Sequence, residues 1–304
     1  MLKVLSFLIL IFYLNVSWAN ISQSDFISIY VIKPKYRLSW DSPSRLLIKT
    51  ALNSIRDDYA PIGHFAVELN CSPEPHGPAQ HVLTGMERIN VKKSKNIVLK
   101  ERLGLGSLFY SFEGNLVPAD QTKKEIEQAR KDKRLKKITV PVSPQNCSRA
   151  LEFLDKWIKS GSYSVYGGEK NTLLGEGAGC ADFASVLFNL SSGYYLPNDW
   201  IVKRKISKKF IGDHENKISF FKLLLRQNWT KKDEDFTDYE TADANLAFDW
   251  INKRSEQNEE YFYPLNLMDI ELVPFEFISK DFFYYYRTTH DPEVIWNSIR
   301  LSNF

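Results

Sequence analysis

Apolar and polar residues alternate along much of the first half of the chain, which is the pattern of β-strands with one buried face. The alternating runs are short and are separated by segments rich in proline and glycine. This pattern predicts a small, mostly antiparallel sheet. The predicted strands cover residues 26–32, 63–70, 80–89, 96–100, 107–112 and 138–142.

Helical periodicity appears at four places around these strands. Ser42-Pro43 begins a helix that we expect to run to about Asp57, with an inward stripe from Leu47 to Ile55. A charged helical stretch precedes the strand at 138–142, Ser143-Pro144 begins a helix to about Lys159, and a further helix begins at Cys180. Helices and strands in this mixture predict an α+β fold.

The alternation becomes weaker after Tyr194. Helices are predicted at 218–226, 242–254 and 293–300, and strands at 261–263 and 269–277. We therefore expect two parts, a core domain over residues 20–195 and a mixed C-terminal extension or cap over residues 196–304.

The N-terminus has the pattern of a cleavable signal peptide. Lys3 is followed by an apolar run from Val4 to Tyr13 and by Ser17-Trp18-Ala19, with small residues at the two positions that a signal peptidase reads. Residues 1–19 are thus expected to be removed during export to the periplasm or the cell exterior. No later stretch of about 18 apolar residues predicts a transmembrane anchor.

Charge excludes one class of partner. The formal net charge is +3, which is too small to indicate a nucleic-acid-binding protein. The segment from Lys123 to Lys137 contains eight basic residues and three acidic ones. This segment fits a solvated connecting helix, and the alternative is a contact with an anionic envelope polymer or lipid surface.

The chain has three cysteines, an odd number for an exported protein. Cys71 and Cys147 can pair in an oxidising compartment, which leaves Cys180 as a free thiol. Cys147 also falls on the apolar stripe of its helix, where a cysteine often serves as a small core residue. Both interpretations of Cys147 remain open at this point.

Cys180 lies at the expected N-terminus of a helix, where the helix dipole favours a thiolate. His64 begins an apolar strand and has the side chain needed to accept the proton of that thiol. Backbone amides at Gly179 and Cys180 are candidate oxyanion donors, and Tyr163 or Tyr166 is a candidate hydroxyl donor. The alternative is that Cys180 is a buried core residue and His64 a satisfied strand residue.

The order of these motifs resembles a known group. Gly63-His64-Phe65-Ala66-Val67 followed much later by Gly179-Cys180-Ala181-Asp182-Phe183 resembles the circularly permuted branch of the NlpC/P60 papain-like superfamily. That branch includes lecithin–retinol acyltransferase-like proteins and bacterial envelope proteins. The resemblance covers about residues 26–190 and implies a papain-like core, in which a small antiparallel sheet packs against the cysteine-bearing helix.

In that family a third polar residue usually stands on the strand after the histidine strand. The expected hairpin register places His64 opposite Met86, so Thr84 fits the position of this orienting residue while His81 fits its chemistry. His76 and His81 lack a set of partner ligands, and we expect neither a metal nor another cofactor.

These features predict an exported cysteine-dependent hydrolase or acyltransferase. The thiol would attack an amide, ester or thioester of a cell-envelope peptide, glycan or lipid. The competing hypothesis is an envelope binding or structural protein that keeps the fold without turnover. Thiol reactivity distinguishes the two.

Overall fold

The computed structural model describes residues 25–56, 61–74, 77–90, 100–167, 170–213 and 215–256. The expected signal peptide, the strand expected at 96–100 and all elements expected beyond residue 256 lie outside the described residues. His76 lies outside them as well.

A six-stranded antiparallel sheet forms the centre of the molecule, and the protein has an α+β fold. The spatial order of its strands is β5-β1-β2-β3-β4-β6. Most consecutive strands therefore lie side by side, as antiparallel hairpin-like connections favour. The strands are β1 (Phe26–Ile32), β2 (His64–Cys71), β3 (Gln80–Arg88), β4 (Phe112–Leu116), β5 (Leu135–Pro141) and β6 (Val165–Tyr166).

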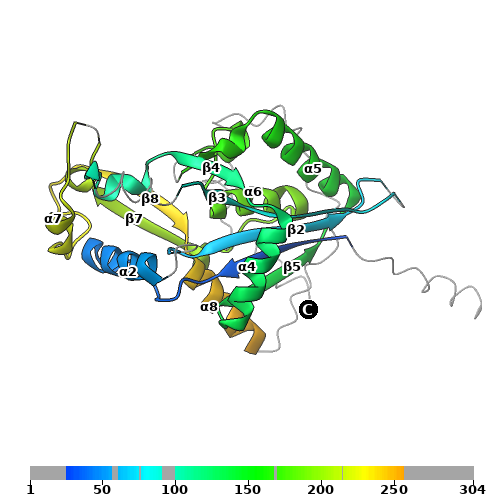
Figure 1. Cartoon of the computed structure of the whole chain (residues 1–304), viewed down its shortest axis with the longest axis horizontal. Helices are drawn as coiled ribbons and strands as arrows, with labels where there is room; N and C mark the ends of the chain where they lie inside the picture. Colours follow the sequence, from blue (N-terminus) through cyan, green and yellow to red (C-terminus); the bar gives the residue numbers. More distant parts are fainter. Residues whose placement is uncertain are drawn as a thin grey trace, which may run out of the picture.

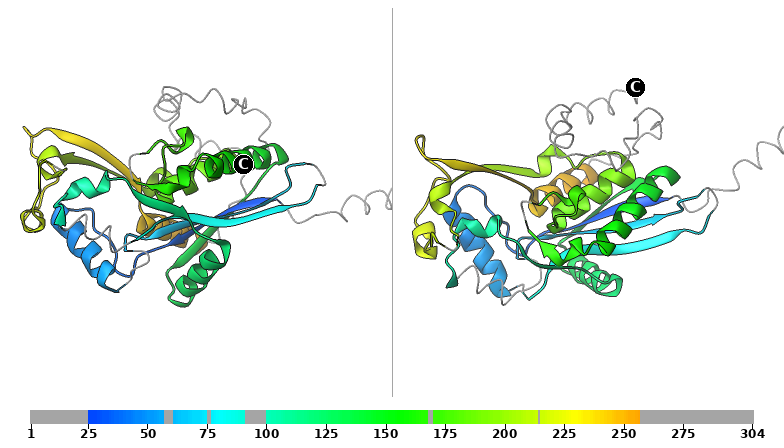
Figure 2. Two further views of the ribbon diagram at one scale, coloured as in Figure 1. Left: turned by 45° about the horizontal axis from the view of Figure 1, so that its top comes forward. Right: turned by 90° about the horizontal axis from the view of Figure 1, so that it is seen from above.

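The main sheet is covered on both faces (Figures 1 and 2). One face carries α5 (Pro144–Lys159) and α6 (Cys180–Ser192), which pack on the apolar side chains of β1 and β2. Helix α4 (Ala119–Lys131) covers the other face, where Ile126 contacts Tyr30 and Ala66. Helix α8 (Ala244–Glu256) packs beside β1 and β5.

Residues after Tyr194 contribute to the main core. Leu196 and Trp200 are buried with it, and so are Ala247 and Phe248 of α8. Phe65 of β2 and Trp200 lie with their ring centroids 6.3 Å apart. The packing of the main sheet therefore continues past residue 195 into the part that the sequence suggests is an extension.

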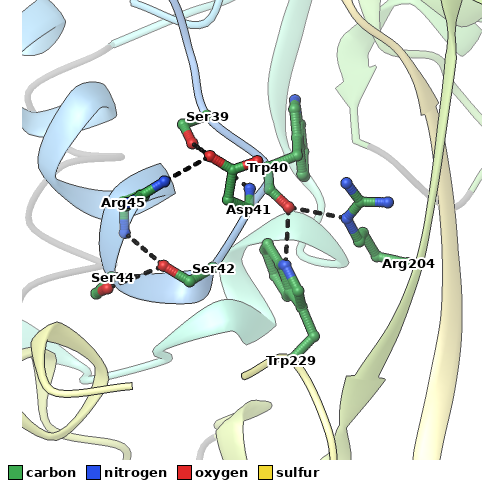
Figure 3. Close-up of polar contacts among 8 residues, drawn as sticks. All are labelled: Ser39, Trp40, Asp41, Ser42, Ser44, Arg45, Arg204 and Trp229. Carbon is green, nitrogen blue, oxygen red and sulfur yellow. Dashed lines mark hydrogen bonds and ion pairs between the residues drawn. The ribbon is translucent and has the colours of Figure 1, made fainter. Parts of the chain in front are cut away.

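A second, smaller apolar cluster lies at one end of the molecule (Figure 1). It is built by the antiparallel hairpin of β7 (Ile201–Ser207) and β8 (Phe236–Ala242) together with α2 (Pro43–Arg56) and α7 (Phe220–Leu224). The Trp40 ring stacks with the Trp229 ring and with the Tyr239 ring, at centroid distances of 6.1 and 5.9 Å. Figure 3 shows the Trp40 carbonyl accepting hydrogen bonds from Arg204 and from Trp229, both 2.9 Å long.

Two expectations about elements are wrong, and one observed hairpin is missing from the expectations. The strand expected at 107–112 lies further along the chain, because Leu105–Leu108 form a short 3-10 helix and β4 begins at Phe112. The expected inner stripe of α2 is partly on the surface, since Ile55 is 80% exposed while Leu46 is buried. The β7–β8 hairpin is not predicted by the sequence, because its strands are separated by 28 residues and lack simple alternation.

Membrane spanning can be examined for the described part of the chain. There, no helix has both the length and the apolar composition needed to cross a bilayer.

Candidate active site

Cys180 is the first residue of α6, as the sequence predicts. Gly179 precedes the helix in an extended conformation and donates its amide proton to the Asp182 carboxylate, at an N to O distance of 3.3 Å. Asp182 is therefore a helix-capping residue. The proposed oxyanion role of the Gly179 amide is not supported, because the cap already uses that donor.

The Cys180 thiol is buried among hydrogen-bond donors. The backbone amide of Phe65 and the hydroxyl of Tyr166 both contact the sulfur, and the Tyr166 Oη to Cys180 Sγ distance is 3.7 Å. Burial raises the pKa of the Cys180 thiol above its usual value, and these donors lower it by less. The acidified thiol expected from the helix N-terminus is therefore wrong for this state, because desolvation of the thiolate exceeds the dipole effect.

Tyr166 bridges the thiol and the start of α6. Its hydroxyl donates toward Cys180 Sγ and accepts from the Cys180 backbone amide. Burial raises the pKa of Tyr166 well above its usual range, so the phenol stays protonated and can donate. Of the two candidate tyrosines, Tyr166 is the one at the sulfur, while Tyr163 packs against the main core.

His64 begins β2 and is buried. Burial lowers the pKa of the His64 imidazole to about 4, so the ring is neutral near neutral pH and can accept a proton. The amide that contacts Cys180 Sγ belongs to Phe65, the next residue along β2, so the thiol lies at the same end of this strand as His64. Phe65 packs into the core with Cys180, whereas the imidazole lies on the face of β2 that carries Ala66 and Gly85.

The hairpin register differs from the expected one by a single residue. Ala66 pairs with Gly85, whereas the expected register pairs Ala66 with Thr84. A shift of one residue moves every side chain to the opposite face. Gly85 thereby lies beside the imidazole, and a Cβ atom at Gly85 would approach His64 Nε2 to 3.0 Å.

Neither candidate for the orienting residue reaches His64. Thr84 pairs with Val67 and donates its hydroxyl proton to the Val117 carbonyl, at 2.8 Å. His81 pairs with Asn70, six residues along β2 from His64, and its Nε2 lies 3.1 Å from Glu68 Oε1 at the surface. The position that abuts the imidazole on β3 carries a glycine and supplies no polar side chain.

Cys71 and Cys147 form a disulfide that joins the far end of β2 to α5. Cys147 is also buried on the inner face of its helix, so both features of this residue noted in the sequence are present. Cys180 is left as the free cysteine of the described chain. Any thiol chemistry in the oxidised protein is thereby restricted to one position.

Two polar residues near the site are not identified by the sequence pattern. Arg88, at the end of β3, lies close enough to Tyr166 to oppose the rise of its pKa. Asp243 caps α8, whose first residue Ala244 packs against Gly63 immediately before His64. The positions of both residues near the site depend on contacts between distant segments, which the sequence does not show. The one weak signal in the sequence is an arginine within a predicted half-buried strand.

The described residues contain no group of three or more His, Cys, Asp or Glu side chains arranged to hold a metal ion. Comparison of the chain with protein-family models, with curated proteins and with solved structures found no match.

Proposed function

We propose that the protein is an exported thiol hydrolase or acyltransferase with a papain-like core, in which Cys180 is the nucleophile and His64 the general base. The carrying observation is the environment of Cys180 Sγ, which lies at a helix N-terminus with the Tyr166 hydroxyl and the Phe65 amide directed at it. A structural cysteine in an apolar core needs no such donors. The order of the histidine strand and the cysteine helix gives independent support.

The proposed reaction begins from a neutral thiol and a neutral imidazole. His64 accepts the thiol proton as Cys180 Sγ bonds to the carbonyl carbon of an amide, ester or thioester. The Tyr166 hydroxyl donates to the oxygen that becomes negative. Collapse expels the amine, alcohol or thiol with the proton returned by His64, and water or another acceptor then cleaves the acyl-enzyme.

Export and an envelope substrate belong to the same proposal. The disulfide between Cys71 and Cys147 supports an oxidising compartment, since such bonds are rare in reducing cytosol. The N-terminal pattern of Lys3 and the apolar run after it supports the same route. A cell-envelope peptide, glycan or lipid is the substrate class that this location offers.

Alkylation of Cys180 by iodoacetamide tests the catalytic pair. With the other two cysteines oxidised, Cys180 is the one thiol to be labelled, and its rate should rise with pH toward an apparent pKa above about 8.5. His64→Ala should slow labelling at pH 7.5 by about tenfold or more, because the proton acceptor is lost. The two rates should converge at high pH, where thiolate forms without a base.

His81→Ala is the matched control, because His81 is exposed and pairs with Asn70, six residues along β2 from His64. It should label as the wild type does. Equal rates for His64→Ala and wild type at pH 7.5 would remove His64 as the base. A thiol that reacts only after unfolding would favour the non-catalytic envelope binding protein.

A further inference from the structure

Arg88 is a charged side chain in a partly buried position, and it has no acidic partner among the described residues. Its guanidinium lies over the Phe112 ring, 5.1 Å from the centroid. Its Nε atom is buried and makes no hydrogen bond, and no ion pair joins Arg88 to the residues that the structure describes. Half-buried charges are normally paired, because the loss of hydration is costly.

The strand packing places this guanidinium beside the candidate active site. Arg88 pairs with Gly114 of β4, and a Cβ atom at Gly114 would lie 2.9 Å from the Tyr166 amide. The glycine therefore allows β6 to approach β4 closely, and Tyr166 comes next to Arg88. The charges of Arg88 and of ionised Tyr166 interact.

The result is a continuous series of groups from nucleophile to cation. Cys180 Sγ contacts the Tyr166 hydroxyl, and this hydroxyl lies near the Arg88 guanidinium. A substrate carbonyl at the sulfur would thus have Tyr166 beside it and the positive charge of Arg88 on the neighbouring strand. Carboxylates and phosphates both match the planar guanidinium through two parallel hydrogen bonds, and a carboxylate is the one of these two groups that the acyl part of a peptide carries.

We propose that Arg88 binds a carboxylate of the substrate next to the scissile carbonyl, so that the protein acts on acidic peptides rather than on neutral lipid esters. This inference rests on the proposed nucleophile and names its substrate class. Arg88 positions the acyl group through its carboxylate, while Cys180 and Tyr166 contact the reacting atoms. The cost of an unpaired charge in the free protein is offset when the substrate binds.

Charge-selective alkylation tests the inference. Iodoacetate carries a carboxylate and iodoacetamide does not, so the ratio of their rates at Cys180 reports an anion site beside the sulfur. This ratio should exceed that of the amino acid cysteine by about tenfold, and Arg88→Gln should return it to the value for cysteine. The iodoacetamide rate of each variant serves as its own reference, so the ratio is corrected for any general change in thiol reactivity caused by the substitution.

Arg149→Gln is the matched control. Arg149 lies two residues after Cys147, which is joined to the opposite end of β2, and it is partly buried like Arg88. This variant loses the same charge and should keep the wild-type ratio. Arg88→Lys should recover part of the selectivity, because it retains the charge without the planar pair of donors.

Binding of N-acetylglutamate provides a measurement that is independent of thiol reactivity. The compound should raise the melting temperature of wild type but not of Arg88→Gln, which should itself melt at or above the wild-type temperature because an uncompensated charge is removed. Glycerol 3-phosphate should have no such effect. Stabilisation by the phosphate alone would overturn the assignment in favour of a phosphate-bearing lipid.

The two proposals fail in different ways. If Cys180 reacts with iodoacetamide in a His64-dependent manner but Arg88→Gln leaves both the rate ratio and the N-acetylglutamate shift unchanged, the carboxylate site is wrong and the nucleophile stands. If the folded protein resists iodoacetamide while N-acetylglutamate still stabilises it through Arg88, the carboxylate site stands as a binding site and the catalytic proposal is wrong.

Discussion

At the residue scale, the environment of each side chain in the site opposes its charged form. Burial lowers the pKa of His64 and raises the pKa of both Cys180 and Tyr166. All three groups are therefore neutral at neutral pH in the free protein. Arg88 is the exception, since an arginine stays protonated even when burial lowers its pKa. A neutral set of reacting groups beside one cation suits a substrate that brings its own negative charge.

The buried His64 should make folding stability depend on pH. Its folded pKa of about 4 lies below its usual 6.5, so the unfolded chain binds the extra proton between these values. The neutral, buried His64 makes its full contribution to the free energy of unfolding above pH 6.5. This contribution falls by about 3 kcal/mol as the pH drops from 6.5 to 4. Urea unfolding of wild type and His64→Gln at several pH values measures it.

The substitution should flatten the stability profile between pH 6.5 and 4 and leave its other slopes in place. Carboxylates also titrate near pH 4 in both proteins. The effect of His64 is therefore measured as the difference in unfolding free energy between wild type and His64→Gln at each pH. Parallel profiles would show that His64 is not desolvated in solution and would also weaken its assignment as a buried base.

At the element scale, the N-terminus of α8 connects the small apolar cluster to the active site. Asp243 Oδ1 accepts hydrogen bonds from the Asn245 and Leu246 amides, and Asp243 Oδ2 accepts one of 2.7 Å from the Trp40 indole. Ala244 then packs against Gly63, whose φ of 91° and lack of Cβ permit this approach. One carboxylate thus fixes the helix that supports the residue before His64.

Replacing this cap should weaken both contacts. Asp243→Ala removes the helix cap and leaves the Trp40 indole without its acceptor, so we expect a loss of about 2–3 kcal/mol in unfolding free energy. Trp40→Phe removes only the indole donor and some packing, and should cost about 1 kcal/mol. Chemical denaturation followed by circular dichroism measures both. Equal losses in the two variants would mean that the cap itself contributes nothing.

At the scale of the whole molecule, the disulfide connects segments that are distant in sequence. Cys71 and Cys147 are separated by 76 residues, and the closed loop contains β3, β4, α4 and β5. Half of the strands of the main sheet therefore fold inside a covalent ring. Cross-linking so long a loop restricts the unfolded chain more than the folded one.

The double variant Cys71→Ala, Cys147→Ala should unfold with a free energy about 4 kcal/mol lower than that of the oxidised protein. Reduction of the wild type should give a similar loss, which distinguishes the cross-link from packing of the two side chains. An unchanged midpoint of denaturation after reduction would show that the ring does not limit the unfolded state.

Local patterns in the sequence determined several elements correctly. Alternation located β1, β2 and β3, and proline with serine located the starts of α2 and α5. The glycines before Cys180 placed the cysteine at the first turn of α6. The odd number of cysteines gave the disulfide between Cys71 and Cys147 as one of two alternatives. These features depend on the conformational preferences of neighbouring residues, which can be recognised in a short stretch of sequence.

Tertiary structure alone decided the rest. The register of β2 against β3 placed Gly85, rather than Thr84 or His81, beside the imidazole, and packing of β4 against β6 brought Arg88 to Tyr166. Burial reversed the expected acidity of the Cys180 thiol. Register, burial and the meeting of distant strands arise from the competition of many long-range contacts, so no local pattern of residues specifies them.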